Sequence, residues 1–320
     1  MFVNWILRSE FRDMVLMTIL LNLLFVFGGS LASEPGHHWG YREHTGPENW
    51  PKTCQDGFRQ SPIDIRAADT DYALLHRMHF VHYDHAGPLN ISNNGHTIIG
   101  NGFDQWGLKQ PYIQGAGLRH RYRLVQFHYH WAQHDHLGSE HKIGGLHYPG
   151  EIHLVHVRHD LTVAEAVKRP DGIAVVGVFL LIGHDSGPNA AVSSVLNDVV
   201  YPGNRSALQG FRVRPLLPPH TEAFYRYEGS LTTPGCDEAV IWTVLADPIS
   251  ITRTQIKEFR QVHSDEGGRF THNYRPVQPL NGRRILYRPS SFDKTFLCSG
   301  HQATSILVVF ADMITKMQIR

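Results

Sequence analysis

The chain has 320 residues, 42% of them hydrophobic, which is enough to form at least one substantial core. Its 30 Lys and Arg residues balance 29 Asp and Glu residues, so no charge excess points to a nucleic-acid partner or an acidic substrate. The 23 histidines favour metal or proton chemistry, because imidazole titrates near neutral pH and is the commonest zinc ligand.

Residues 1–32 have the features of a secretory signal peptide. Arg8 and Arg12 precede an apolar run over 14–27, and the small residues Ser30 and Ala32 offer a cleavage site after Ala32. The mature chain would then begin at residue 33. The alternative is a signal anchor that stays in the membrane. The favoured interpretation predicts a secreted protein or one displayed at the extracellular cell surface.

Cysteines and glycosylation acceptors agree with export. Cys54, Cys236 and Cys298 suffice for one disulfide bond and one leftover thiol, and the sequence alone permits three pairings. Asn90 and Asn204 each begin an Asn-x-Ser tripeptide, which is an acceptor for N-glycosylation. Together these features favour the secretory route.

The body of the chain is predicted to be one mainly β domain over 33–287 with short peripheral helices. No linker, repeat or change in composition divides it, and turn-rich clusters separate short runs of β-forming residues. Continuous apolar runs predict buried strands over 173–182 and 239–246. Apolar residues at helical spacing predict helices over 163–167 and 251–263.

The tail over 288–320 differs from the domain before it. The stretch 305–317 is moderately apolar, but Asp312 and Lys316 interrupt it. A GPI-anchor signal needs small residues, a polar spacer and an uninterrupted hydrophobic tail. A plain extension is therefore favoured over a lipid anchor, which would be the protein's only attachment to a membrane.

The segment 126–131 alternates polar and aromatic residues, which predicts a strand with two different faces. His128 and His130 share one face with Gln126, while the three aromatic residues point toward a core. A helix would place residues two positions apart on different faces.

A second predicted strand over 151–156 places His153 on one face with Glu151 and Val155. If the two strands are neighbours, three imidazoles meet at one point. Three neutral histidines leave the fourth position of zinc open, which is the catalytic arrangement, and zinc then lowers the pKa of its bound water to ~7. The residues alone also permit solvated strand histidines or a cupin-type jelly roll.

Several motifs in a fixed order carry a family resemblance. Besides the two histidine strands, they are HWGY at 38–41, QSPIDI at 60–65, NNGH at 93–96, GSEH at 138–141, SLTTP at 230–234 and NYRP at 273–276. From residue 37 to about 284 the chain resembles an α-class carbonic anhydrase of the extracellular type. The resemblance implies a central twisted, mostly antiparallel sheet of about ten strands and a conical cleft that leads to Zn²⁺. It also implies reversible hydration of carbon dioxide to bicarbonate and a proton by zinc-bound hydroxide.

The resemblance assigns residues to the metal site. The zinc ligands are His128, His130 and His153. Their hydrogen-bond partners are, in the same order, Gln126, the backbone of Asn273, and Glu151. Because a ligand histidine needs its outer ring nitrogen bonded to an oxygen, the side-chain partners agree with the same-face positions found above.

The resemblance also implies groups that handle the substrate. Thr232 matches the residue that accepts a hydrogen bond from the nucleophile and donates one to Glu140, and Thr233 matches a neighbour that places bicarbonate. An apolar wall for carbon dioxide matches Val155, Val175, Leu231 and Trp242. From the residues alone, these four would be interpreted as ordinary core.

His96 matches the family's proton shuttle. A histidine with a pKa near 7 can carry the proton from the metal to solvent through ordered water. Tyr41 and Asn94 match polar residues that order this water. From the residues alone, His96 would be a surface turn residue.

The resemblance pairs Cys54 with Cys236, as in extracellular members, and leaves Cys298 unpaired outside the matching region. The chain departs from the family pattern at three positions: Tyr274 stands where tryptophan is common, and Ile99 and Asn101 replace residues that are often polar or acidic on the cleft wall. These departures bear on inhibitor preference and rate.

Two functions compete. The first is an active hydratase, which is expected to bind carbon dioxide and bicarbonate, to bind sulfonamide and anion inhibitors, and to show weak esterase activity. The second is a catalytically inactive binding module, as found in relatives that have lost zinc ligands. The complete ligand set favours the enzyme.

Overall fold

The computed structural model describes residues 38–290. The predicted signal peptide over 1–32, Cys298 and all of the predicted tail except residues 288–290 lie outside the described residues. Within 38–290, the helices are too short and too polar to cross a membrane.

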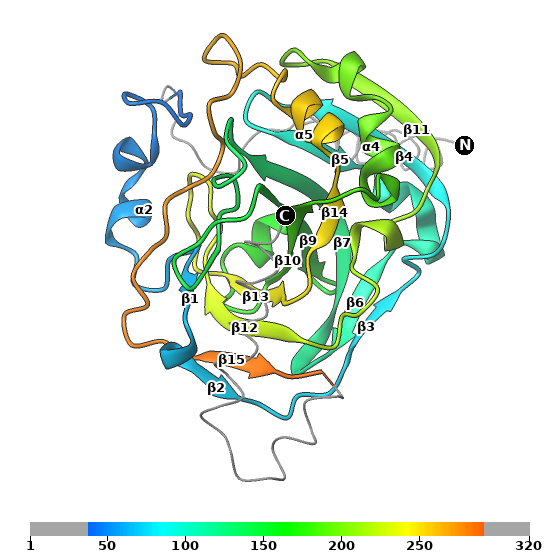
Figure 1. The fold of residues 1–320 in the computed structure, drawn as a ribbon. Coiled ribbons are helices and arrows are strands. Elements are labelled where there is room, and N and C mark those ends of the chain that lie inside the picture. The colour runs from blue at the N-terminus through cyan, green and yellow to red at the C-terminus, as the bar shows by residue number, and fades with distance from the viewer. Residues whose placement is uncertain (1–37, 291–320) are drawn as a thin grey trace, which may run out of the picture. The chain divides into compact units, whose positions relative to one another are not determined.

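A large twisted sheet organises the described part of the chain (Figure 1). Ten of its strands follow one another in the order β11 (Arg205–Phe211), β4 (Gly87–Asn93), β5 (Ile98–Asn101), β7 (Leu118–Trp131), β9 (Gly150–Arg158), β10 (Ile173–Ile182), β13 (Val240–Leu245), β12 (Phe224–Gly229), β15 (Ile285–Arg288) and β2 (Thr70–Tyr72). Beside this path lie β3 (Met78–Val81), β6 (Tyr112–Gly115) and β14 (Ile249–Ile251). A separate pair is formed by β1 (Asp64–Ile65) and β8 (Lys142–Ile143).

The topology confirms the predicted mainly β fold. Among the described strands, nine pairings of the large sheet are antiparallel and three are parallel. The predicted strand over 173–182 coincides with β10, and the one over 239–246 contains β13. These two strands pair in parallel at the centre of the sheet, and both are buried on both faces, which explains their continuous apolar sequences.

The described helices are short, as predicted. They are α2 (Lys52–Asp56), α3 (Val163–Ala166), α4 (Ala190–Ser193) and α5 (Arg253–Phe259), together with the 3-10 helices η1 (Pro47–Asn49), η2 (Ala67–Asp69), η3 (Phe103–Lys109), η4 (Gly187–Asn189), η5 (Leu196–Val199) and η6 (Arg214–Leu216). The prediction of a helix over 251–263 was too long. Ile251 ends β14, and a capping box between Thr252 and Gln255 fixes the start of α5 at Arg253.

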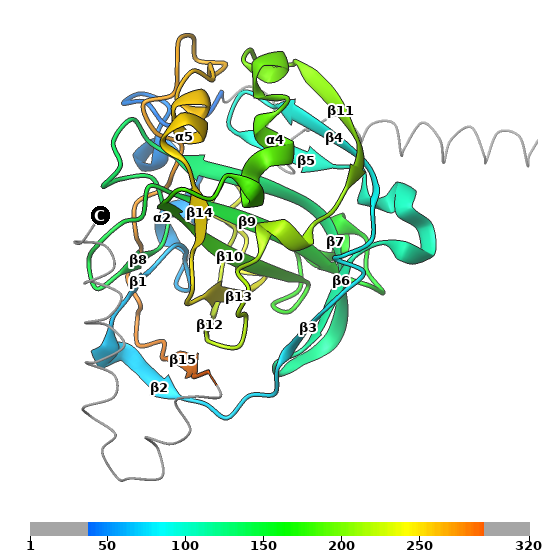
Figure 2. The ribbon, with the colours of Figure 1, turned by 45° about the vertical axis from the view of Figure 1, so that its right-hand side comes forward.

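The two faces of β7 meet different surroundings. Its aromatic residues join a core that includes α4 and α5, with the rings of Tyr129 and Phe259 4.7 Å apart. Figures 1 and 2 show α4 and α5 close together on this side of the sheet. The opposite face packs against a second core, which contains Val155 and Trp242. The two-faced strand predicted over 126–131 is therefore confirmed, and α4 and α5 lie on its aromatic side.

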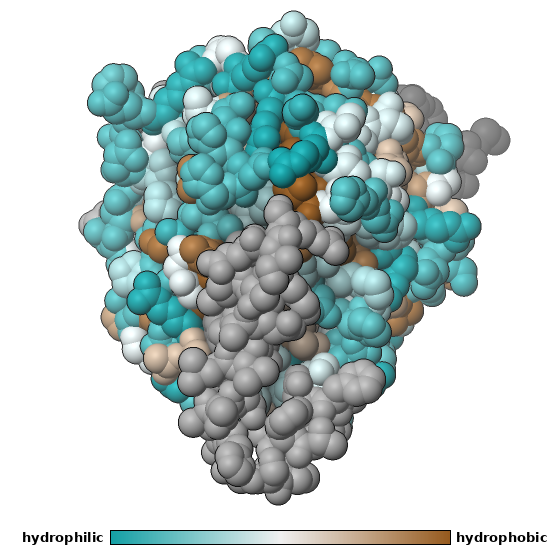
Figure 3. Space-filling view, in the orientation of Figure 1, coloured by the Kyte–Doolittle hydropathy of each residue, from teal (hydrophilic) through white to brown (hydrophobic). Residues whose placement is uncertain are grey.

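The surface is mostly polar. On the face seen in Figure 3, hydrophobic residues occur in small patches between hydrophilic ones. The largest exposed apolar side chains of the described part are dispersed along the sequence: Phe58, Leu74, Leu108, Leu146, Tyr201 and Leu286. Such scattered residues are normal on a folded domain.

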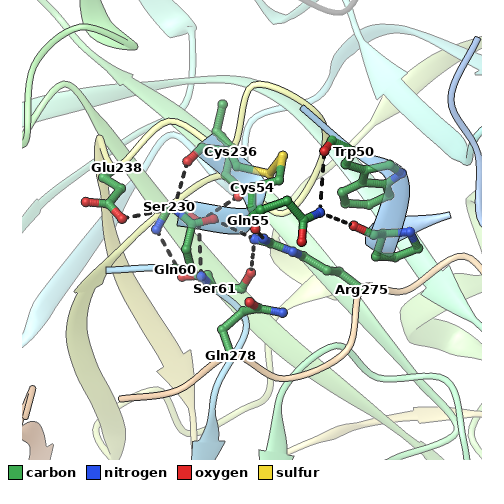
Figure 4. The surroundings of a disulfide bond; sticks show 12 residues. Trp50, Cys54, Gln55, Gln60, Ser61, Ser230, Cys236, Glu238, Arg275 and Gln278 are labelled. Carbon is green, nitrogen blue, oxygen red and sulfur yellow. Dashed lines mark hydrogen bonds between the residues drawn. A yellow bond between two sulfur atoms is a disulfide. The ribbon is translucent and has the colours of Figure 1, made fainter. Parts of the chain in front are cut away.

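A disulfide bond joins Cys54 in α2 to Cys236, with the Cα atoms 5.1 Å apart (Figure 4). This confirms the pairing implied by the resemblance. Both cysteines are buried beside Trp50, and the guanidinium of Arg275 donates a hydrogen bond to the carbonyl oxygen of Cys54. The bond fixes the N-terminal segment to the loop that carries Thr232.

Replacing both Cys54 and Cys236 by serine is expected to lower the free energy of unfolding by about 2–4 kcal/mol, because the bond closes a loop between residues 182 positions apart and limits the unfolded chain. Urea unfolding of the two proteins measures the difference. An unchanged midpoint and slope would contradict this stabilising role.

Candidate metal centre

The strand register brings three histidines together. In the antiparallel pair β7–β9, His128 lies opposite His153, and His130 follows two residues later on the same face. One nitrogen from each ring lies within 4.8 Å of the other two. His130 and His153 are buried and His128 is partly exposed, so the cluster is accessible from the side of His128.

Each ring donates its outer N–H to an oxygen. His128 Nδ1 donates to the side-chain oxygen of Gln126 at 2.9 Å. His130 Nδ1 donates to the backbone carbonyl of Asn273 at 2.7 Å, and His153 Nε2 donates to the carboxylate of Glu151 at 2.9 Å. These are the partners that the family resemblance implies, and each oxygen is an acceptor, so the outer nitrogen must carry the proton.

In a neutral imidazole whose outer nitrogen carries the proton, the inner nitrogen has the lone pair. Burial lowers the pKa values of His128 and His130, so both rings are neutral at physiological pH. His130 Nε2 and His153 Nδ1 face each other at 3.1 Å. A cation between these two nitrogens would be coordinated by both of them.

The donor set fits zinc. Zn²⁺ prefers tetrahedral coordination with imidazole nitrogens at about 2.0–2.1 Å, which places two ligand nitrogens about 3.3 Å apart. The 3.1 Å separation of His130 Nε2 and His153 Nδ1 is close to this value. Three histidine ligands also leave one coordination position for water or substrate.

A buried hydrogen-bond relay holds His153. The carboxylate of Glu151 accepts from His153, from His141 Nδ1 at 2.8 Å and from the backbone N–H of His141 at 2.9 Å. Burial alone would raise the pKa of Glu151, but His141 and His153 outweigh it and hold this pKa well below its ordinary value. Gly177 leaves room for the carboxylate, since a Cβ there would lie 2.9 Å from its Oε1. His153 is thus fixed by an ionised partner.

Glu140 lies beside the inner nitrogens with one free oxygen. Its Oε1 accepts a hydrogen bond from the backbone N–H of Arg275 at 2.8 Å. Its Oε2 is buried, lies 3.6 Å from His130 Nε2, and receives no hydrogen bond from any residue within 38–290. The hydrogen bond from Thr232 that the resemblance implies is therefore not formed here, although Thr232 is buried in the adjoining loop. Glu140 keeps an acceptor directed at the metal site.

An apolar wall borders the histidines. Trp242 packs its ring 4.7 Å from that of His153. The four residues assigned to the carbon dioxide wall belong to one cluster: Val155, Val175, Leu231 and Trp242. They come from β9, β10, the loop before Thr232, and β13, which the sheet order brings together. Thr233 is half-buried in the same loop as Thr232.

His96 stacks on Trp39, with ring centroids 3.7 Å apart. Its Nε2 lies 3.6 Å from the carboxylate of Asp265. Burial, reinforced by His38, lowers the pKa of His96 to about 4, so the ring is neutral at pH 7 in this position. Tyr41 and Asn94 are the residues expected to order the water. Tyr41 is buried, and the side-chain oxygen of Asn94 accepts a hydrogen bond from the backbone N–H of His96.

The three departures from the family pattern lie close to histidines or to Gln126. Ile99 and Asn101 in β5 are directly opposite His128 and Gln126. The ring of Tyr274 lies between two imidazoles, 5.0 Å from His272 and 5.2 Å from His147.

Sequence reasoning missed two supports of the site. His141 was seen only as part of the GSEH motif, yet it links Glu151 to the hydroxyl of Tyr227 at 2.7 Å. Arg275 was seen only as part of NYRP, yet its buried guanidinium donates to the side chain of Gln60 and the carbonyl of Ser61 (Figure 4). Both residues belong to motifs that carry the family resemblance, and this membership is the sign in the sequence that they support the site.

Comparisons with known proteins agree with this site. The model of the eukaryotic-type carbonic anhydrase family matches residues 45–289. The chain is 52% identical over 308 residues to the Caenorhabditis elegans protein named "Putative carbonic anhydrase 5", covering 96% of this chain and 99% of the relative. It is 37% identical over 259 residues to human "Carbonic anhydrase 7", covering 78% and 97% respectively. The chain therefore belongs to the eukaryotic-type carbonic anhydrase family.

Proposed function

We propose that the protein catalyses the reversible hydration of carbon dioxide to bicarbonate and a proton at a zinc ion held by His128, His130 and His153. One observation carries the proposal: three imidazoles converge with their inner nitrogens facing one another and their outer nitrogens bound to oxygen acceptors. Zinc, when bound, supplies the acidity that makes water a nucleophile near neutral pH.

The surrounding residues bind and orient. The cluster that contains Val155 and Trp242 offers carbon dioxide an apolar surface beside His153. Glu140 keeps Oε2 available as an acceptor, which permits Thr232 to donate to it and to accept a hydrogen bond from the attacking group. Thr233 follows in the same loop and is assigned to bicarbonate. Because Thr232 accepts a hydrogen bond from the attacking group, this arrangement selects a nucleophile that has a hydrogen atom to donate.

Metal removal tests the proposal. Treatment with a chelator is expected to abolish carbon dioxide hydration, and one equivalent of Zn²⁺ is expected to restore it. A sulfonamide is expected to inhibit the restored enzyme. Hydration that persists without metal, or a metal-loaded protein that never hydrates carbon dioxide, would contradict the proposal and favour a binding module.

We assign the proton shuttle to His96. In the stacked position its ring is neutral, because burial beside Trp39 disfavours the charged form. The proton-carrying ring is therefore expected to leave Trp39 for solvent. His96→Ala is expected to slow hydration at least about tenfold in weak buffer, with recovery on addition of imidazole. Stopped-flow rates at several imidazole concentrations measure this, and a loss that imidazole does not restore would remove His96 from the role.

Export to the secretory pathway is proposed on three supports: the predicted signal peptide over 1–32, the Cys54–Cys236 bond, and the exposure of Asn90 and Asn204. A protein made in a secreting eukaryotic cell is expected to appear in the medium or on the cell surface. Removal of N-glycans should lower its mass, and an intracellular, unglycosylated product would contradict the proposal.

A further inference from the structure

A cavity lies beside the face of the sheet opposite the histidines. It has a volume of about 740 Å³, and its wall includes Arg226 of β12. Arg226 lies opposite Thr243 of β13. Trp242, the residue before Thr243 in the same strand, packs against His153. Since successive strand residues point to opposite faces, Arg226 and His153 lie on opposite faces of the sheet. The cavity wall also includes Tyr227, whose hydroxyl contacts His141 on the histidine side.

Arg226 is a buried cation without a carboxylate partner. Its side chain donates to Thr243 Oγ1 from Nε at 3.1 Å and from Nη2 at 2.9 Å, and from Nη1 to the carbonyl of Ala116 at 2.8 Å. These contacts use three of its five N–H groups. No acidic residue within 38–290 forms an ion pair with it, although only 7% of the residue is exposed. Burial lowers the pKa of Arg226 to about 10, which leaves it charged at pH 7.

The two carboxylates in the cavity wall are already paired. Asp171 binds Arg158 at 2.9 Å, and Glu228 binds Arg59 at 3.1 Å. Both arginines lie outside the wall. The wall acids are therefore engaged by other cations and do not neutralise Arg226.

The other arginines in the wall add positive charge. Arg283 donates to backbone carbonyls only, including that of Glu228 at 3.0 Å. Arg119 is exposed and has no ion pair with any described residue. Arg284 is paired with Asp71 at 2.5 Å. Three of the four wall arginines thus lack a carboxylate, and the cavity favours an anion.

The wall also carries apolar side chains. Leu75, Ile241 and Leu286 line the cavity beside the arginines. Its volume falls in the range of small-molecule sites, which combine apolar surface with a few charged groups that orient the ligand. An inorganic anion would leave this apolar surface uncovered.

We propose that this cavity binds an amphipathic carboxylate, with the carboxylate head at Arg226 and the apolar body against Leu75, Ile241 and Leu286. The site is distinct from the zinc centre and does not depend on the proposed hydratase activity. It offers a planar guanidinium with two free N–H groups, which suits a carboxylate.

Isothermal titration of the purified protein with octanoate tests the proposal. Metal is first removed by a chelator, so that a carboxylate cannot bind at the metal centre. One octanoate per chain is expected to bind, while acetate, octanol and inorganic phosphate are expected to bind at least about tenfold more weakly. Arg226→Gln is expected to weaken octanoate binding at least about tenfold, because hydrogen bonds to a charged group are lost.

Two further variants keep the test decisive. Leu286→Glu places a negative charge at a surface position of the wall and is expected to weaken octanoate binding. It provides a test even if Arg226→Gln does not fold. Circular dichroism checks the folding of each variant. Arg121→Gln is the matched control: Arg121 lies on the same strand as Arg119 but stacks on Tyr112, outside the cavity wall. Octanoate binding that is absent, or that survives both wall changes in folded protein, would overturn the proposal. Equal affinity for phosphate would reduce the site to a simple anion site and overturn the amphipathic assignment.

Discussion

His130→Ala is expected to abolish zinc binding and carbon dioxide hydration together. His130 is buried, and its ring is held by the backbone carbonyl of Asn273. Its Nε2 lies 3.1 Å from the inner nitrogen of His153. The variant leaves two ligand nitrogens where a catalytic zinc site requires three protein ligands. Zinc content after dialysis and stopped-flow hydration of the same sample measure the two losses. We expect less than one tenth of the zinc and hydration at the uncatalysed rate.

The matched control is His134→Ala. His134 lies four residues further along the chain, is exposed, and stacks on His136 rather than entering the triad. It should keep both zinc and activity, so that a loss common to both variants would indicate damage to the fold. A His130→Ala protein that retains stoichiometric zinc would contradict the ligand assignment.

Glu140→Gln is expected to lower kcat/KM for carbon dioxide about 100-fold while leaving zinc bound. The carboxylate presents an unpaired Oε2 at 3.6 Å from His130 Nε2, and it is the acceptor we assign to the Thr232 hydroxyl. An amide can turn an N–H toward that hydroxyl, which reverses the direction of the hydrogen bond and misaligns the nucleophile. Groups that position a reacting atom typically contribute factors of this size.

Thr232→Val provides the companion measurement. It removes the hydroxyl but keeps the side-chain volume, and it is expected to cause a loss similar to that of Glu140→Gln. If the two groups act as a pair, the double variant loses little more than either single variant, because the second change removes an interaction that is already broken. Independent, multiplying losses, or a fully active Thr232→Val protein, would contradict the pairing.

The local conformation of the site could be predicted from sequence, but its assembly could not. Alternation in 126–131 is enough to place His128 and His130 on one face, because side chains of a strand alternate. The register that sets His128 opposite His153 depends on the pairing of β7 with β9, which the residues alone leave open. The resemblance supplied that pairing, and it also selected Cys54–Cys236 from three possibilities.

Other features depend on tertiary contacts that no local pattern reveals. His141 acts through Glu151, and only folding brings its ring to Tyr227, 86 residues away in the sequence. Arg226 sits in an alternating strand sequence that suggests a solvent-facing cation, yet β13 and the turn at Ala116 bury it. The end of α5 was misplaced because apolar spacing continues past Phe259 after the helical hydrogen bonds stop.

Stopped-flow hydration of carbon dioxide by the purified wild-type protein, with zinc quantified in the same sample, tests the central assignment most directly. We predict one zinc per chain and a hydration rate well above the uncatalysed rate, with both lost in the presence of a chelator. A folded protein that binds no zinc, or that binds one zinc per chain without accelerating hydration, would contradict the assignment of this histidine cluster as a catalytic centre.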